Sequence, residues 1–266
     1  MKKVFYFIGL FLMVLVINGC SSTTKSLEEQ YKGQSANDLY NQAETALAKK
    51  SYLDAVKYFE ALQTIYPFGE HAEQTQRDLM YAYYKSDDKV SAAAAADRFI
   101  RMYPRSEYVD YAIYLRGLAN FDQKRGILQN LFYTDLSQRD FGTMTQAFSD
   151  FKLLLERFPS SKYAADAYQR MVYLRNLFAK HELDVAKFYM RRKAYVAANN
   201  RASYIVEHLQ GAPEVKQALI ILVQANTALG LTKPAEDAKR VLALNYPDAL
   251  KNQGQALKTK PWYKWW

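Results

Sequence analysis

Hydrophobic and polar positions along most of the chain follow one plan that recurs four times. In each copy an alanine stands 12 residues before a proline, and an aromatic residue directly precedes that proline. The alanine–proline pairs are Ala55 with Pro67, Ala92 with Pro104, Ala147 with Pro159, and Ala235 with Pro247. A small residue lets two helices approach closely, and proline stops a helix because it lacks an N–H and disfavours helix in the preceding residue. The pattern therefore predicts a series of antiparallel helix pairs.

This plan resembles the second half of the tetratricopeptide repeat. The interval from Pro67 to Pro104 is 37 residues, close to that repeat's period of about 34. We predict an all-α tetratricopeptide-repeat superhelix of about five helical hairpins, with an insertion in the third near residues 121–142. We predict one continuous solenoid over residues 36–250. A lone hairpin cannot bury its apolar face, so neighbouring hairpins must cover it. Its units lie near 36–67, 71–104, 107–159, 163–213 and 214–247. The register of the fourth unit stays open, because Ala198 lies 15 residues, and not 12, before Pro213.

The first residues predict export. Lys2 and Lys3 precede a run from Val4 to Ile17 that is apolar except for Gly9. This run is shorter than the roughly 20 residues that span a bilayer, so residues 1–19 are predicted to be a secretory signal peptide. The ending Ile17-Asn18-Gly19-Cys20 resembles the bacterial lipobox, which implies cleavage after Gly19 and acylation, including palmitate, at Cys20. Cys20 is the only cysteine.

The polar residues after Cys20 predict a lipidated flexible tether over 20–35. Ser21 follows the cysteine where inner-membrane retention favours Asp, so we expect a lipid anchor on the periplasmic face of the outer membrane. At the other end, residues 251–266 form a basic aromatic tail, which suits a membrane interface, a partner or a disordered terminus.

The first helices of tetratricopeptide units line a groove. Counting back from Pro104 places Leu79, Met80 and Tyr83 toward the core. The same count turns five residues of this unit toward the groove: Gln74, Arg77, Tyr81, Tyr84 and Lys85. In the first unit the groove-facing residues are Asn37, Tyr40, Glu44, Leu47 and Ala48. Two aromatics flanked by Arg and Lys suit an extended peptide with aromatic side chains and a free carboxylate. The alternative is that the two tyrosines are packing residues.

Charge and composition favour binding over catalysis. The formal net charge is +9, and removing residues 1–19 leaves 34 basic and 27 acidic residues, or +7. Basic and acidic residues interleave, which argues against a nucleic-acid binder. His71, His181 and His208 are isolated, and the sequence has neither His/Cys metal spacing nor a Gly-rich phosphate loop. We therefore expect no catalytic residue, no metal and no cofactor beyond the lipid on Cys20.

Several stretches carry a more specific resemblance. They include Tyr66-Pro67-Phe68-Gly69, Asp78 to Lys85, Asp97 to Arg101, Tyr114 to Leu118, Arg139-Asp140, Ala147 to Phe151, Val196-Ala197 and Asn200-Arg201. With them the chain resembles the BamD family, the tetratricopeptide lipoproteins of the outer-membrane β-barrel assembly machinery.

The resemblance implies a set of partners. They are the barrel-forming subunit with its periplasmic domains, accessory lipoproteins, and the C-terminal signals of unfolded outer membrane proteins. It assigns Arg201 to the barrel-subunit contact, and Tyr66, Tyr81 and Tyr84 to peptide capture. Two other functions stay open: an adaptor of a different envelope complex, and a basic nucleic-acid or peptidoglycan binder.

Overall fold

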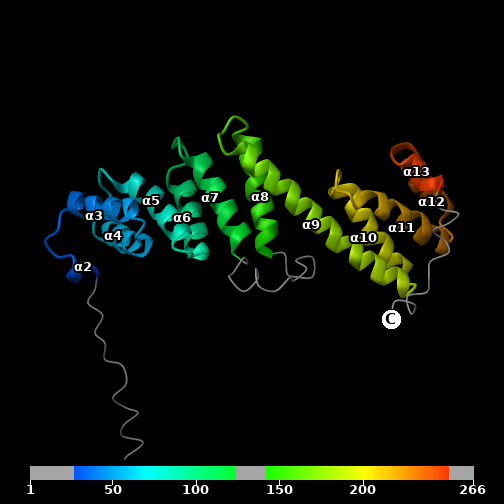
Figure 1. Ribbon diagram of the computed structural model, residues 1–266, viewed down its shortest axis with the longest axis horizontal. Helices are drawn as coiled ribbons and strands as arrows, with labels where there is room; N and C mark the ends of the chain where they lie inside the picture. Colours follow the sequence, from blue (N-terminus) through cyan, green and yellow to red (C-terminus); the bar gives the residue numbers. More distant parts are fainter. Residues whose placement is uncertain (1–26, 124–141, 252–266) are drawn as a thin grey trace, which may run out of the picture. The chain divides into compact units, whose positions relative to one another are not determined.

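A computed structural model describes residues 27–123 and 142–251 (Figure 1). All regular secondary structure of these residues is α-helical, and consecutive helices pack as antiparallel hairpins. The prediction of an all-α, tetratricopeptide-like chain is therefore confirmed. The chain divides into two compact units, residues 1–82 and 83–266. Each unit is described by itself.

The first unit is built on the hairpin of α3 (Ala36–Ala48) and α4 (Tyr52–Ile65), preceded by the short α2 (Leu27–Gln30). Ser35 caps α3: its side chain accepts the Asp38 N–H, and the Asp38 carboxylate accepts the Ser35 N–H. This reciprocal pair satisfies two backbone donors at the helix start. The unit also contains most of α5 (Ala72–Lys85).

The segment before Ser35 is anchored to the first unit. Tyr31 is buried with Leu39 and Leu62, and its ring lies edge-on at 5.8 Å from the ring of Tyr58. The predicted tether over 20–35 is therefore wrong for its second half, while residues 20–26 lie outside the described residues. The residues after Tyr31 are mostly polar, so the sequence does not indicate that the Tyr31 side chain packs against α4.

The second unit continues the series of hairpins. Its helices are α6 (Lys89–Met102), α7 (Val109–Asp122), α8 (Gly142–Arg157), α9 (Ala164–Arg191), α10 (Tyr195–His208), α11 (Val215–Ala228), α12 (Thr232–Asn245) and α13 (Pro247–Lys251). Each packs against the next, and α11 also reaches α9. On either side of the predicted insertion near 121–142, α7 ends at Asp122 and α8 begins at Gly142. Residues 124–141 lie outside the described residues.

Each closing proline follows a helix end, as the sequence predicts. The N–H groups of Tyr66, Tyr103, Phe158 and Tyr246 donate to the carbonyl four residues earlier, and proline comes next. Of the small residues 12 positions before these prolines, Ala55, Ala92 and Ala147 are fully buried. Ala235 is only half-buried. The helices that pack against α12 are α11 and the short α13, and they leave part of its surface uncovered.

The fourth hairpin owes its extra length to α9, which runs for 28 residues. The predicted closing residue, Pro213, is not at the closing position. Leu209 takes the place of the aromatic residue, since its N–H donates to Ile205, and Gln210 takes the place of the proline. Ala198, fully buried, stands 12 residues before Gln210. This settles the register that the sequence left open.

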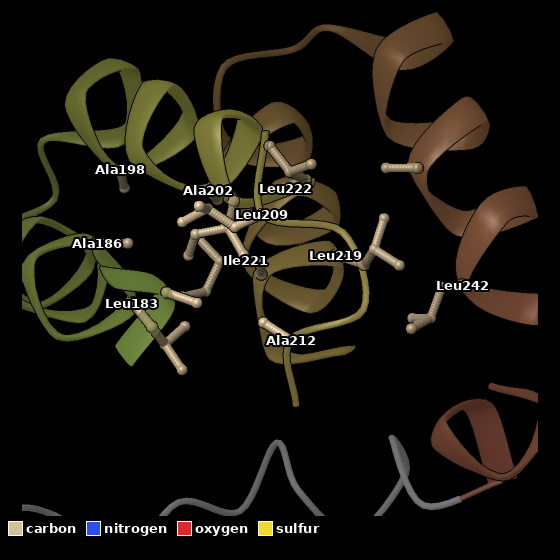
Figure 2. Close-up of a cluster of buried hydrophobic side chains, with 14 of the residues drawn as sticks. Leu183, Ala186, Ala198, Ala202, Leu209, Ala212, Leu219, Ile221, Leu222 and Leu242 are labelled. Atoms are coloured by element: carbon tan, nitrogen blue, oxygen red, sulfur yellow. The ribbon is translucent and has the colours of Figure 1, made fainter. Parts of the chain in front are cut away.

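Alanine and leucine side chains make the core of α9 to α12 (Figure 2). Leu183 and Ala186 of α9 face Ala198 and Ala202 of α10. Small residues at this contact let the two helices lie close together, and the leucines of α11 and α12 fill the space beside them.

A buried polar cluster joins α6, α7 and α8. Asp150 is 1% exposed and accepts hydrogen bonds from Arg116 (Nε to Oδ1, 2.9 Å), Asn120 (Nδ2 to Oδ2, 2.9 Å) and Gln146 (Nε2 to Oδ1, 3.2 Å). Arg116 also donates to Asp97 of α6 at 2.7 Å. The buried charge is thus paired and hydrogen-bonded on all sides, as a buried carboxylate requires.

Candidate protein-binding surface

The first unit places polar and aromatic side chains of α3 beside the start of α5. The His71 ring stacks on the Tyr40 ring, with centroids 4.2 Å apart and planes inclined by 4°. Its Nε2 lies 2.7 Å from Asn37 Oδ1, and its Nδ1 lies 3.3 Å from Gln74 Oε1. The predicted groove residues Asn37, Tyr40 and Gln74 therefore do meet, and His71 is the residue that joins them. In the sequence His71 is an isolated histidine, and only the packing of α3 beside α5 shows this role.

Arg77 is held by its own neighbour. Its Nε and Nη2 donate to the two carboxylate oxygens of Asp78, each at 2.9 Å. Glu44 of α3 lies near this pair, and burial, followed by the charge of Asp78, raises its pKa. One Glu44 oxygen, Oε1, is buried with no hydrogen-bond partner among the described residues. This surface therefore combines one bidentate ion pair with one unsatisfied acceptor.

Exposed aromatic rings flank these charges. Tyr81 is 37% exposed and leans edge-on against Tyr52, with ring centroids 6.3 Å apart. Tyr66 is exposed and its hydroxyl donates to the Gln34 carbonyl at 2.9 Å. Phe68, which no groove count selected, is 91% exposed. Phe68 could have been selected from the sequence, because it is an apolar residue directly after a closing proline, where the helical pattern has already ended.

A hollow of about 290 Å³ lies beside Tyr66 and His71 in the first unit. Tyr66, Asn37, Leu62 and His71 are among its lining residues. It joins an aromatic wall to amide and imidazole groups, a combination that suits a polypeptide side chain.

Tyr84, in the second unit, is committed to an intramolecular bond. Its hydroxyl donates to Asp122 Oδ2 at 2.6 Å, and the Lys89 ammonium lies 3.9 Å from its ring centroid. Burial and the Asp122 hydrogen bond raise the pKa of Tyr84 well above its ordinary value. Lys85 is exposed at the end of α5. The Tyr84 hydroxyl is thus taken up by Asp122, and one face of its ring is covered by Lys89.

A second phenol in this unit is arranged in the same way. Tyr114 donates to Asp166 Oδ2 at 2.6 Å, and Arg170 Nε donates to the same oxygen at 2.5 Å. Burial and the Asp166 hydrogen bond raise the pKa of Tyr114 to about 12. The Arg170 guanidinium also lies 5.1 Å from the centroid of the Phe121 ring. Phenol, carboxylate and guanidinium together tie α7 to α9.

Tyr114 should make stability depend on alkaline pH. An unfolded tyrosine ionises near pH 10, so the neutral phenol favours the folded state below pH 10. This contribution is lost as the pH rises from about 10 to about 12. Phenolate absorbance should show a late-ionising tyrosine that disappears in Tyr114→Phe. Identical titration curves for the two proteins would contradict the Tyr114–Asp166 contact.

Arg201 of α10 also has an intramolecular partner. Its Nη1 donates to both oxygens of Glu182, at 3.3 and 3.1 Å. The Arg201 side chain is 46% exposed, whereas that of Glu182 is 15% exposed. Arg201 therefore presents an open edge to solvent, while Glu182 of α9 holds the guanidinium in position.

Within residues 27–123 and 142–251, no three His, Cys, Asp or Glu side chains are grouped to hold a metal ion. None of the helices in this part of the chain has the length and apolar character needed to cross a membrane. Cys20 lies outside the described residues, as does the tail beyond residue 251.

Comparison with known proteins decides the family. A family model described as "Outer membrane lipoprotein" (YfiO) matches residues 32–241. A protein of Neisseria meningitidis serogroup B named "Outer membrane protein assembly factor BamD" is 38% identical over 269 residues, covering 100% of both chains. The chain belongs to the BamD (YfiO) family of outer membrane lipoproteins. The BamD of Vibrio cholerae is 40% identical over 234 residues, covering 88% of this chain and 95% of its own. The BamD of Xylella fastidiosa strain Temecula1 is 38% identical over 251 residues, covering 94% and 83%.

Membership of the BamD family fixes the broad role. The chain is an outer membrane protein assembly factor associated with the outer membrane. Assembly factors of the BamD family are non-catalytic scaffolds, so the prediction that the chain is not an enzyme is confirmed. The resemblance identified from the sequence is likewise confirmed.

Proposed function

We propose that the chain is a lipid-anchored scaffold of the machinery that assembles β-barrel proteins in the outer membrane. It binds the barrel-forming subunit, accessory lipoproteins and the C-terminal signals of unfolded outer membrane proteins. The observation that carries this proposal is the set of exposed aromatic rings beside charged and amide groups on α3 to α5, in a family whose relatives are named assembly factors.

The anchor is the acyl group on Cys20, with residues 1–19 acting as a cleaved signal peptide. Each buried methylene of an acyl chain contributes about 0.8 kcal/mol, and several chains together hold a protein on a membrane. The anchor holds the helical body on the periplasmic face, where unfolded barrel proteins arrive.

The residues proposed for peptide binding in the first unit are Tyr66, Gln74, Arg77 and Tyr81. In the second unit, Tyr84 and Lys85 are proposed for the same role. Rigid aromatic side chains bury large contact areas at small conformational cost. Lys85 and Arg77 supply positive charge for a peptide carboxylate, although Arg77 must then share its guanidinium with Asp78.

The first test is the affinity for a synthetic peptide copied from the last residues of an outer membrane β-barrel protein. Tyr81→Ala should weaken binding by about tenfold or more, as for an aromatic residue at the centre of an interface. Isothermal titration on chains with unchanged circular dichroism measures the effect. Tyr168→Ala is the matched control, because Tyr168 is an exposed tyrosine of α9 and is not one of the residues proposed for peptide binding. Equal affinities for the wild type and Tyr81→Ala would remove the groove from the proposal.

The contact with the barrel-forming subunit is assigned to Arg201. A half-exposed guanidinium held at one edge by a carboxylate keeps other donors for a second carboxylate. Glu182 sets its orientation, so the partner meets an Arg that is already positioned.

A further inference from the structure

The turn between α9 and α10 gathers unpaired positive charge. Arg191, Arg192 and Lys193 are consecutive and all exposed. Between Val185 and Val206 the sequence contains five Lys or Arg residues and no Asp or Glu. Within the part of the chain that the structure describes, none of the three residues at the turn has an acidic partner. The nearest acid on the same helix, Asp184, lies 3.9 Å from Lys187.

Backbone geometry fixes where these charges lie. The Arg192 N–H donates to the Phe188 and Tyr189 carbonyls, and the Lys193 N–H donates to Met190. Lys193 has a φ of 58°, in the left-handed region, so the chain reverses within a few residues. The turn that carries the three residues lies at one end of the α9–α10 hairpin (Figure 1).

Apolar side chains are exposed at the same end. Phe188 is 42% exposed and Val196 is 60% exposed. The Arg192 guanidinium lies 4.9 Å from the centroid of the Phe188 ring. Basic residues at a helix C-terminus also stabilise that helix through its dipole. That effect explains the charges but leaves the exposed phenyl and isopropyl groups without a role.

A hollow of about 530 Å³ opens beside them. Its lining residues are Asp184, Val185, Lys187, Phe188, Tyr189 and Arg191, and Lys187 pairs with Asp184. It thus offers the Arg191 cation beside an aromatic wall, which is the chemistry that an anionic headgroup with its acyl root requires.

We propose that this end of the α9–α10 hairpin docks on the anionic phospholipid surface of the membrane. Arg191, Arg192 and Lys193 face the headgroup phosphates, while Phe188 and Val196 enter the boundary between headgroups and acyl chains. An acidic protein surface would also attract the charges. A lipid surface fits better, because the family is one of outer membrane lipoproteins and the exposed apolar groups accompany the charges. This inference does not depend on the peptide surface of the first unit.

The test uses the mature chain, residues 20–266, with Cys20→Ser so that no acyl anchor masks weak binding. Co-sedimentation is measured with vesicles of phosphatidylcholine and with vesicles that also contain phosphatidylglycerol. The chain should bind the anionic vesicles more tightly. The triple variant Arg191→Gln/Arg192→Gln/Lys193→Gln should lose roughly ten- to a hundredfold in partition coefficient. Phe188→Ser/Val196→Ser should also weaken binding, without abolishing the preference for anionic vesicles.

A matched variant separates position from total charge. Lys32→Gln/Lys49→Gln/Lys50→Gln removes three exposed positive charges from the first unit and should bind like the wild type. Equal losses in the two triple variants would show only a general charge effect and would overturn the proposal. Absence of vesicle binding by the wild type would overturn it too, and would leave an acidic protein as the partner of this surface.

Discussion

Asp150→Ala is expected to lower the free energy of unfolding by about 3–5 kcal/mol. The substitution removes a carboxylate that is 1% exposed and leaves Arg116 and Asn120 facing an apolar gap. Arg116 would keep only its pair with Asp97, and the loss of the second carboxylate is costly because Arg cannot lose its proton to become neutral. Asp150→Asn should cost less, since an amide preserves the shape and one acceptor.

Urea denaturation followed by circular dichroism measures this effect. Asp237→Ala is the control, because Asp237 pairs with Arg240 at the surface, where an ion pair contributes at most about 1 kcal/mol. If Asp150→Ala and Asp237→Ala cost the same, the cluster on α6, α7 and α8 does not hold these helices together.

Gly117→Val is expected to destabilise the second unit by about 2–3 kcal/mol, the upper range for overpacking a core. A Cβ at Gly117 would lie 2.7 Å from Phe151 Cε1 and 2.9 Å from its Cδ1. Phe151 is fully buried, so its ring has no free space to enter. In an exposed helix, replacing glycine would gain a few tenths of a kcal/mol, which the clash exceeds.

The same denaturation experiment distinguishes crowding from a general intolerance of substitution. Gly69→Val should be nearly neutral, because nothing lies within 4 Å of a Cβ at that position. The double variant Gly117→Val/Phe151→Leu should cost less than the sum of the two single variants, since the smaller side chain makes room. Full additivity would mean that the two residues are not in contact.

Much of the fold could be read from the sequence, because its signals are local. Proline and the aromatic residue before it act within one helix end, so four hairpins could be placed by spacing alone. The closing position of the fourth of the five hairpins was predicted wrongly. No proline occupies position 210, and the first proline afterwards, Pro213, lies three residues too late. No Gly or Pro interrupts residues 164–191, which is consistent with the single 28-residue helix α9.

The partners of the site residues could not be read in this way. Tyr84 meets Asp122 across 38 residues, and Arg201 meets Glu182 across 19. Such contacts depend on how helices pack, which spacing within one repeat does not encode. The basic turn coincides with a stretch of sequence that has no acidic residue, but the overall interleaving of basic and acidic residues does not single it out.

Identifying the proteins that the chain binds tests whether it is a scaffold for β-barrel assembly. The full-length acylated chain would be isolated from outer membranes in mild detergent and the co-purifying proteins identified by mass spectrometry. We predict stoichiometric recovery of a barrel-forming membrane subunit with periplasmic domains, and reduced recovery with Arg201→Ala. Recovery of a different envelope complex, with no barrel-forming subunit present, would contradict the account.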